Sequence, residues 1–127
     1  MLAAIDTQQG TLSAWVKARA DTLNDGAPYA LMRMTADGNN YLLVYRHNNG
    51  INAEYRAGGT SVYAGGSLTD DDWHHVTMTW DTSANALELW LDGTLANRSV
   101  DLGTWSGAVV DAVLGAYAVG TFHWAGH

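Results

Sequence analysis

The residues best suited to ligand chemistry in this sequence are aromatic rings that carry a polar atom. The 127 residues include six Trp and six Tyr but a single Phe. Indole and phenol rings suit sugars, because the ring face packs on apolar C–H groups while the N–H or O–H group bonds to hydroxyls. Such rings also serve as core residues or oligomer contacts, so each must be placed on a face before a ligand is assigned to it.

Trp90 and Trp105 are the two tryptophans best placed for ligand contact. Trp90 alternates with Leu89 and Leu91, so its ring should point away from the core that those leucines form. Trp105 lies in the glycine-flanked stretch Gly103–Gly107, which we expect to be an exposed loop. We predict that both rings contact a sugar.

Two tyrosines complete the predicted contact set. Residues two apart on a strand point to the same side, so Tyr45 shares a face with Tyr41, and Tyr55 shares a face with Ala53. We predict Tyr45 and Tyr55 as further ligand-binding residues.

The sequence does not offer the paired carboxylates that glycosidases need. The two groups lie roughly 5–5.5 Å apart in retaining enzymes and roughly 6.5–9.5 Å apart in inverting ones. Glu88 and Asp92 are the one suggestive pair on a strand face, and their separation along the strand is ~13 Å. Asp92 also has a structural role as the first residue of an Asp-Gly turn. We therefore predict that the protein is not an enzyme.

Metal binding is suggested by a single acidic run, Asp70, Asp71 and Asp72. Calcium prefers such loops, because they supply both carboxylate and carbonyl oxygens. A solvated turn ahead of a strand is the alternative interpretation, and we favour it. The neighbouring His74 and His75 are adjacent on a strand, so they point to opposite faces and cannot chelate one metal together. We expect no required cofactor, and calcium is the one metal to test.

The elements that would position these residues are short alternating runs separated by turn residues, a pattern typical of an all-β sandwich or barrel. The strongest strands are predicted at 73–80 and 86–92. Asp92-Gly93 predicts a type I′ hairpin, and Asn48-Asn49-Gly50 predicts another tight turn. Further strands are predicted at 11–17, 29–34, 41–46, 51–56, 60–64, 95–100 and within 109–117, and residues 121–127 begin one more segment.

Composition limits the classes of partner. The net charge of −7, with six basic residues, argues against nucleic acid, which needs clustered Lys and Arg. No apolar run approaches the ~20 residues that span a bilayer, so no membrane partner is expected. The absence of Cys excludes disulfides and thiolate metal sites. The length predicts one domain covering residues 1–127.

Five segments resemble, in order and spacing, the laminin-G-like domains of the concanavalin A-like lectin/glucanase superfamily. They are GTLSAWVKA from Gly10, DDDWHHVTMTWD from Asp70, LELWLDGTLA from Leu87, VLGA from Val113 and FHWAGH from Phe122. The resemblance implies an antiparallel jelly-roll β-sandwich. It also implies that Trp15 and Trp73 are packed, and that His74 or His75 makes a structural hydrogen bond near a buried Trp73.

The same resemblance implies a non-catalytic binding module, with carbohydrate as the expected ligand. The alternative is a structural or adhesive domain that contacts other proteins or itself. The chain is short at both ends relative to the family pattern, and unpaired strand edges invite another strand, so we expect a homo-oligomer. The family favours an extracellular location within a larger exported protein, although residues 1–6 lack the features of a signal peptide.

Overall fold

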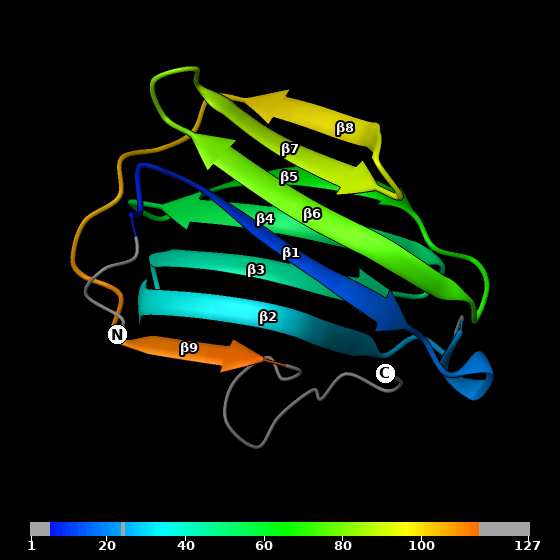
Figure 1. Ribbon diagram of the computed structural model, residues 1–127. Coiled ribbons are helices and arrows are strands. Elements are labelled where there is room, and N and C mark those ends of the chain that lie inside the picture. The colour runs from blue at the N-terminus through cyan, green and yellow to red at the C-terminus, as the bar shows by residue number, and fades with distance from the viewer. Residues whose placement is uncertain (1–5, 24, 115–127) are drawn as a thin grey trace.

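The computed structural model describes residues 6–23 and 25–114, which form two antiparallel sheets packed face to face (Figure 1). The four-stranded sheet contains, in spatial order, β1 (Gln9–Lys17), β6 (Trp73–Asp81), β7 (Ala86–Leu91) and β8 (Thr94–Val100). The five-stranded sheet contains β5 (Thr60–Ser67), β4 (Gly50–Ala57), β3 (Asn40–His47), β2 (Pro28–Asp37) and β9 (Asp111–Leu114). A short 3₁₀ helix, η2 (Ala20–Thr22), follows β1. The predicted all-β sandwich is confirmed.

Tight turns with left-handed backbone join the hairpins. Asp92 and Gly93, between β7 and β8, have φ angles of 53° and 80°. Two consecutive residues with positive φ are what a type I′ turn requires, and its twist matches that of the flanking strands. Asn48, between β3 and β4, has a φ of 51°. Both hairpins therefore form where the Asx and Gly residues predict them.

The core lies between the sheets and is built by strict alternation along the central strands. Leu42 and Val44 on β3 and Leu87 and Leu89 on β7 enter the same core from opposite sheets, and all four are completely buried. Each such side chain contributes roughly 1.5–3 kcal/mol when it is removed from water. The alternate residues on the same strands must point outward. The strand register that buries the core therefore also determines which side chains form the two outer faces.

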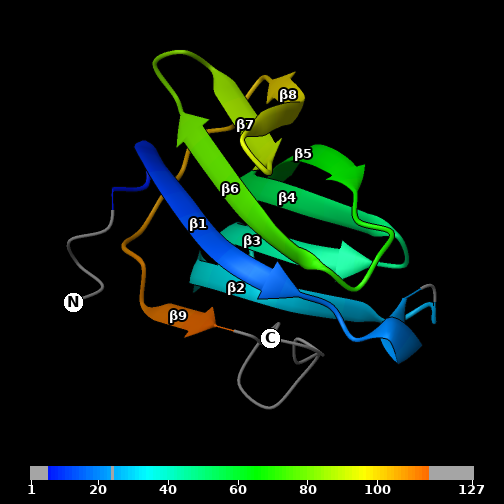
Figure 2. The same ribbon diagram turned by 45° about the vertical axis from the view of Figure 1, so that its right-hand side comes forward.

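The edge strands of the two sheets are joined by a hydrogen bond on one side of the sandwich and are the outermost described strands on the other. Where β5 and β8 meet, the Ser99 hydroxyl donates a hydrogen bond to the carbonyl oxygen of Tyr63. On the opposite side, β1 and β9 are the outermost strands within the described residues (Figure 2). Pairing of edges between chains stays a prediction. The segment predicted to begin at residue 121, and the end of the strand predicted within 109–117, lie outside the described residues.

No helix among the described residues is long and apolar enough to cross a bilayer.

Candidate functional site

Two outer faces carry the side chains that alternate with the core. We call the outer side of β2 to β5 the meander face, formed by Arg33, Thr35, Tyr41, Leu43, Tyr45, Asn52, Glu54, Arg56, Ser61 and Tyr63. We call the outer side of β1, β6, β7 and β8 the tryptophan face, formed by Thr11, Ser13, Trp15, Lys17, Trp73, His75, Thr77, Thr79, Asp81, Glu88, Trp90 and Arg98. Each face is a candidate site.

A buried carboxylate is the centre of the meander face. Glu54 is only 4% exposed, although it points away from the core. Its Oε1 accepts hydrogen bonds from the Tyr41 hydroxyl at 3.0 Å and from the Ser61 hydroxyl at 2.8 Å. A charged group in so dry a position has to be hydrogen-bonded, and these two neighbours supply the bonds. The carboxylate is therefore held in one orientation by strands on both sides.

Two arginines flank this carboxylate. The Arg33 guanidinium carbon lies 4.2 Å from the centroid of the Tyr41 ring, a distance suited to cation–π attraction. Arg56 donates from Nη1 to the Ser61 hydroxyl at 3.0 Å and from Nε to the Gly38 carbonyl at 3.2 Å. With Glu54, these groups sum to a formal charge of +1 on a chain whose net charge is −7. The meander face is thus a local positive region of an acidic protein.

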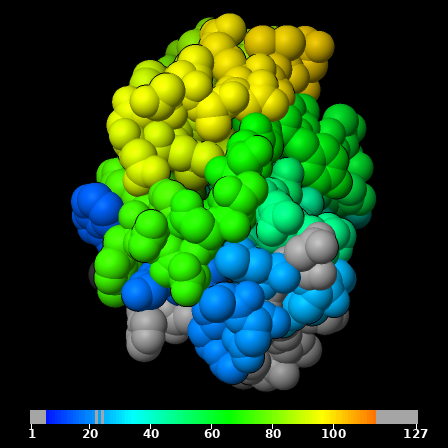
Figure 3. Space-filling model, turned by 90° about the vertical axis from the view of Figure 1, so that its right-hand side faces the viewer, coloured from blue at the N-terminus to red at the C-terminus, as the bar shows by residue number. Residues whose placement is uncertain are grey.

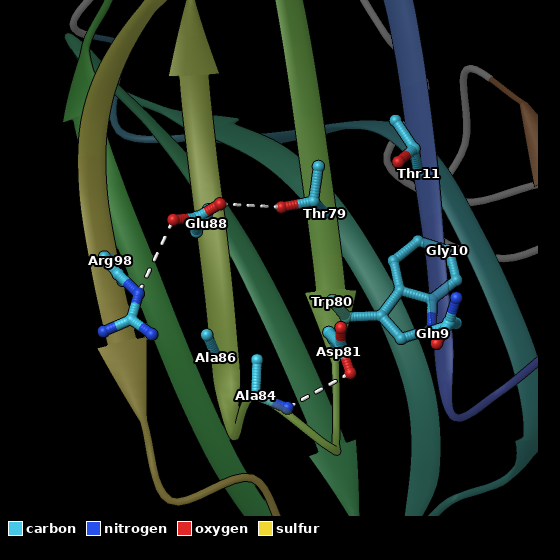
Figure 4. Close-up of a pocket in the computed structure, with 10 residues that line it drawn as sticks. All are labelled: Gln9, Gly10, Thr11, Thr79, Trp80, Asp81, Ala84, Ala86, Glu88 and Arg98. Atoms are coloured by element: carbon cyan, nitrogen blue, oxygen red, sulfur yellow. Dashed lines mark hydrogen bonds and ion pairs between the residues drawn. The ribbon is translucent and has the colours of Figure 1, made fainter.

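A hollow of about 410 Å³ occupies one end of the tryptophan face (Figure 4). Glu88 lies between its neighbours on the adjacent strands: the Thr79 hydroxyl donates to its Oε1 at 3.3 Å, and the Arg98 Nε is 3.5 Å from its Oε2. Asp81 lies on the same wall and accepts hydrogen bonds from Ser83. The lining is polar and carries two carboxylates against one guanidinium.

Exposed rings occupy the rest of the tryptophan face. Trp15 is 65% exposed and Trp73 is 53% exposed. His75, directly opposite Trp15 in the register, lies with its ring centroid 5.2 Å from that of Trp15. Trp90 is half-buried and lies in the row between this ring pair and Glu88. The packing of Trp15 and Trp73 implied by the resemblance is therefore wrong, because the alternation of β1 and β6 turns both rings outward.

His74 has the structural role that was expected, but near an exposed rather than a buried Trp73. Its Nε2 is 2.7 Å from Asp70 Oδ1 and its Nδ1 is 2.7 Å from Asp92 Oδ2. These hydrogen bonds raise the pKa of His74, and they lower the pKa of Asp70 and of Asp92. The imidazole thus joins the loop after β5 to the β7–β8 hairpin at the end of the sandwich, where these segments gather in Figure 3.

The four predicted contact residues separate into two groups. Trp90 lies on the tryptophan face and Tyr45 on the meander face. Tyr55 is completely buried, and its hydroxyl donates to the Thr7 carbonyl at 2.9 Å. Trp105 is 6% exposed and packs against Tyr55, with ring centroids 5.8 Å apart. The expected exposure of Trp105 is wrong, and neither of these core rings presents a face to solvent.

The charged residues of the meander face were missed from the sequence. The signal lay in the run from Asn52 to Ala57, where Asn52, Glu54 and Arg56 alternate with Ala53, Tyr55 and Ala57. Because the even-numbered residues of this strand are all polar, they define an outer face. Tyr55 was predicted to bind ligand because its ring carries a hydroxyl. The alternation of this strand instead assigns it to the core.

The acidic residues considered for catalysis, and Asp70 of the acidic run, are bonded to neighbouring groups. Asp92 is engaged by His74 and by the backbone N–H of His75, and Glu88 by Thr79 and Arg98. Asp70 is bonded to His74 and to the Asp72 N–H. Within residues 6–23 and 25–114, no group of three or more His, Asp or Glu side chains is arranged to hold a metal ion. For Asp70, Asp71 and Asp72, the favoured interpretation as a solvated turn and the alternative of calcium binding both stay predictions.

Comparisons with known proteins match both the sequence and the fold. The family model described as the concanavalin A-like lectin/glucanases superfamily matches residues 2–127. A mouse protein, "Sushi, von Willebrand factor type A, EGF and pentraxin domain-containing protein 1", is 30% identical over 94 residues. That alignment covers 72% of this chain, and the chain spans about 2% of the length of the mouse protein.

Two solved structures share the fold at low sequence identity. The CBM40 module of the Ruminococcus gnavus IT-sialidase, bound to α2,3-sialyllactose, is 18% identical with a TM-score of 0.74, over 94% of this chain and 71% of that one. Domains LG4-5 of the mouse laminin α1 chain are 11% identical with a TM-score of 0.73, over 93% of this chain and 32% of that one.

Proposed function

The chain belongs to the concanavalin A-like lectin/glucanase superfamily, and from that premise we propose that it is a non-catalytic carbohydrate-binding module whose ligand binds at the meander face. The observation that carries the proposal is the buried, doubly hydrogen-bonded carboxylate of Glu54 between two arginines.

This arrangement suits sugar recognition because its polar groups are already oriented. Side chains that are fixed before binding lose little conformational entropy on binding, so more of each hydrogen bond appears as affinity. Glu54 accepts from hydroxyls, and Arg56 donates to them. Tyr63, which is 51% exposed on the neighbouring strand, and Tyr45 supply ring faces for the apolar side of a sugar.

The positive charge of the meander face favours a sugar with a carboxylate. Guanidinium groups bind carboxylates through paired, charge-assisted hydrogen bonds, which Arg33 and Arg56 would supply from β2 and β4. Sialyllactose, which carries a carboxylate, is therefore the first ligand to test, and it is also the ligand of a module with a similar fold. Because the identity is 18%, the likeness concerns the fold alone, and the choice of ligand rests on the two arginines.

The test is a calorimetric titration of the full chain with 3′-sialyllactose and with lactose. We expect sialyllactose to bind and lactose to bind at least tenfold more weakly, a difference of about 1.4 kcal/mol. Arg56→Ala should weaken sialyllactose binding by a similar factor. Arg98→Ala removes an arginine from the tryptophan face and is the matched control. It should leave sialyllactose binding unchanged. Equal loss in both variants, or no binding of either sugar, would reject the proposal.

We propose that the module does not hydrolyse its ligand and that it acts within a larger exported protein. The first part rests on the similarity in fold to a carbohydrate-binding module and to laminin domains. Release of sialic acid from sialyllactose during long incubation would contradict it. The second part rests on the small share of the mouse relative that the chain covers.

Self-association is the alternative function. It rests on β1 and β9, which are the outermost strands of their sheets within the described residues. An outer strand presents N–H and C=O groups that pair readily with another chain. Light scattering over a concentration series tests it, since a constant monomer mass would exclude assembly of this kind.

A further inference from the structure

We propose that the tryptophan face is a second and separate glycan site, which binds an uncharged hexose oligosaccharide. The inference is independent of the meander face, because the two faces lie on opposite sides of the sandwich and share no residue.

The first step is the spacing of the rings. Trp90 lies on β7 and Trp15 on β1, two strands away and one outward row further along, so their Cα atoms are roughly 12 Å apart. Trp73 is the diagonal neighbour of Trp15 across the β1–β6 ladder, at roughly 7–8 Å. Along the strands the three rings lie in successive outward rows, but the path from Trp90 on β7 to Trp15 on β1 returns by one strand to Trp73 on β6, so the rings frame an area of the face rather than a straight line.

The second step is the chemistry between the rings. Ser13 and Thr77 lie in the same row as Trp90, and Thr11 and Thr79 lie in the next row beside Glu88. Hydroxyl side chains both donate and accept, which matches the hydroxyl rim of a hexose. The central part of a protein–protein interface is instead apolar and depleted of charged residues. Rings separated by hydroxyl rows therefore favour a sugar over a protein partner.

The third step concerns the hollow beside Glu88, at one end of the tryptophan face. Its volume of about 410 Å³ lies within the range of small-ligand sites, roughly 300–1,000 Å³. Asp81 and Glu88 make its wall acidic, and Arg98, the one guanidinium in the lining, already faces Glu88. Carboxylates accept from sugar hydroxyls but repel a sugar acid. With Lys17 opposite Trp73 at the other end, the formal charges of Asp81, Glu88, Arg98 and Lys17 sum to zero. The face therefore favours an uncharged sugar, whereas the meander face favours an anionic one.

The experiment uses the indole N–H signals of the ¹⁵N-labelled protein, one for each of the six tryptophans. The probes are cellohexaose and its charged counterpart, the β-1,4-linked hexaglucuronate. Cellohexaose should shift the signals of Trp15, Trp73 and Trp90 and leave that of the buried Trp105 in place. Hexaglucuronate should leave all of these signals unchanged.

Variants test which residues carry the affinity. Trp90→Ala should weaken cellohexaose binding roughly tenfold, as expected for the loss of a central ring, and Trp90→Phe should restore most of it. Trp15→Ala removes a ring that is 65% exposed, so it tests the same face without risk to the core. Arg56→Ala should leave cellohexaose binding unchanged, which separates this site from the meander face.

Three results would overturn the inference. One is the absence of indole shifts at millimolar cellohexaose. Another is equal binding of hexaglucuronate, which would contradict the role of the acidic wall. The third is a concentration-dependent mass in the native chain that Trp15→Ala or Trp90→Ala abolishes, which would assign these rings to contacts between chains. Loss of sialyllactose binding alone would reject the meander-face proposal and leave this one intact.

Discussion

The meander face and the tryptophan face are made by the same strand alternation, yet they expose opposite kinds of group. On the meander face Glu54 and Arg56 bond to hydroxyl groups from β3 and β5, and the central Glu54 is 4% exposed. On the tryptophan face the rings extend into solvent, and the side chain of Glu88 keeps 28% of its surface exposed. A face whose polar side chains are fixed by hydrogen bonds is rigid and selective. A face of exposed rings accommodates many ligands that present an apolar side.

The energetic difference follows from solvent access. A buried charge has lost its hydration, so each of its hydrogen bonds must replace a bond to water. An exposed ion pair such as Glu88 and Arg98 keeps much of its hydration and contributes little. The meander face should therefore be coupled to the stability of the fold, and the tryptophan face should be nearly independent of it.

Gly10 offers the largest expected effect, at the edge of the hollow on the tryptophan face. A Cβ added there would lie 2.5 Å from the Trp80 ring, which is buried and bonded through Nε1 to the Asp6 carbonyl. Gly10→Ala should therefore cost about 3 kcal/mol in unfolding free energy, as overpacking does. Gly38→Ala, at a turn beside the meander face with nothing within 4 Å, is the control and should cost far less. Urea denaturation measures both, and equal costs would refute the packing argument.

Glu54 and Glu88 test the comparison directly. Glu54→Ala leaves the Tyr41 and Ser61 hydroxyls without their acceptor in a dry environment, which should cost about 2 kcal/mol in unfolding free energy. Glu88→Ala should cost under about 1 kcal/mol, because its partners remain hydrated. Thermal and urea denaturation give both values. If the two costs were the same, the proposed contrast in rigidity would be lost.

His74, which joins the loop after β5 to the β7–β8 hairpin, should make the stability of this end of the sandwich depend on pH. Its pKa is raised above the ordinary 6.5, so its stabilisation is present below that value and is lost as pH rises through the higher folded-state pKa. The pKa values of Asp70 and Asp92 are lowered from 3.8, so their stabilisation is present above that value and is lost as pH falls through the lowered ones. The contribution of the cluster is therefore largest between about pH 4 and 6.5.

The measurement is the melting temperature of the native chain and of His74→Gln from pH 4 to 9. The native chain should lose stability above pH 6.5 relative to the variant, and added salt should reduce the difference, because the two carboxylates are half exposed. Parallel curves for the two proteins would show that the His74 hydrogen bonds do not contribute.

Calcium should have the smallest effect. Asp70 is already bonded to His74 and to the Asp72 N–H, so the acidic run offers few oxygens to an ion that prefers six to eight. We expect the same melting temperature with calcium and with a chelator. A rise with calcium, absent in Asp71→Asn, would instead establish a metal site at the aromatic end of the tryptophan face.

The sequence was most informative where period-two alternation and turn residues agreed. Leu87, Leu89 and Leu91 with the Asp92-Gly93 turn correctly predicted a hairpin and the outward direction of Trp90. Trp105 could not be placed in this way, because it lies in a non-repetitive segment and is buried by contact with Tyr55, 50 residues away in the chain. Glu54 was missed because its burial results from neighbours on β3 and β5, which no local pattern reveals.

The pairing of β1 with β6 has a consequence for the order in which the chain can assemble. Trp15 is aligned with His75, 60 residues later, whereas β2 to β5 are joined by short hairpins. Contacts between distant segments carry a larger loop-closure entropy and form more slowly than local ones. During synthesis, β1 has no partner in its own sheet until β6 has left the ribosome. We therefore expect the hairpins of β2 to β5 to form first and the four-stranded sheet to close over them.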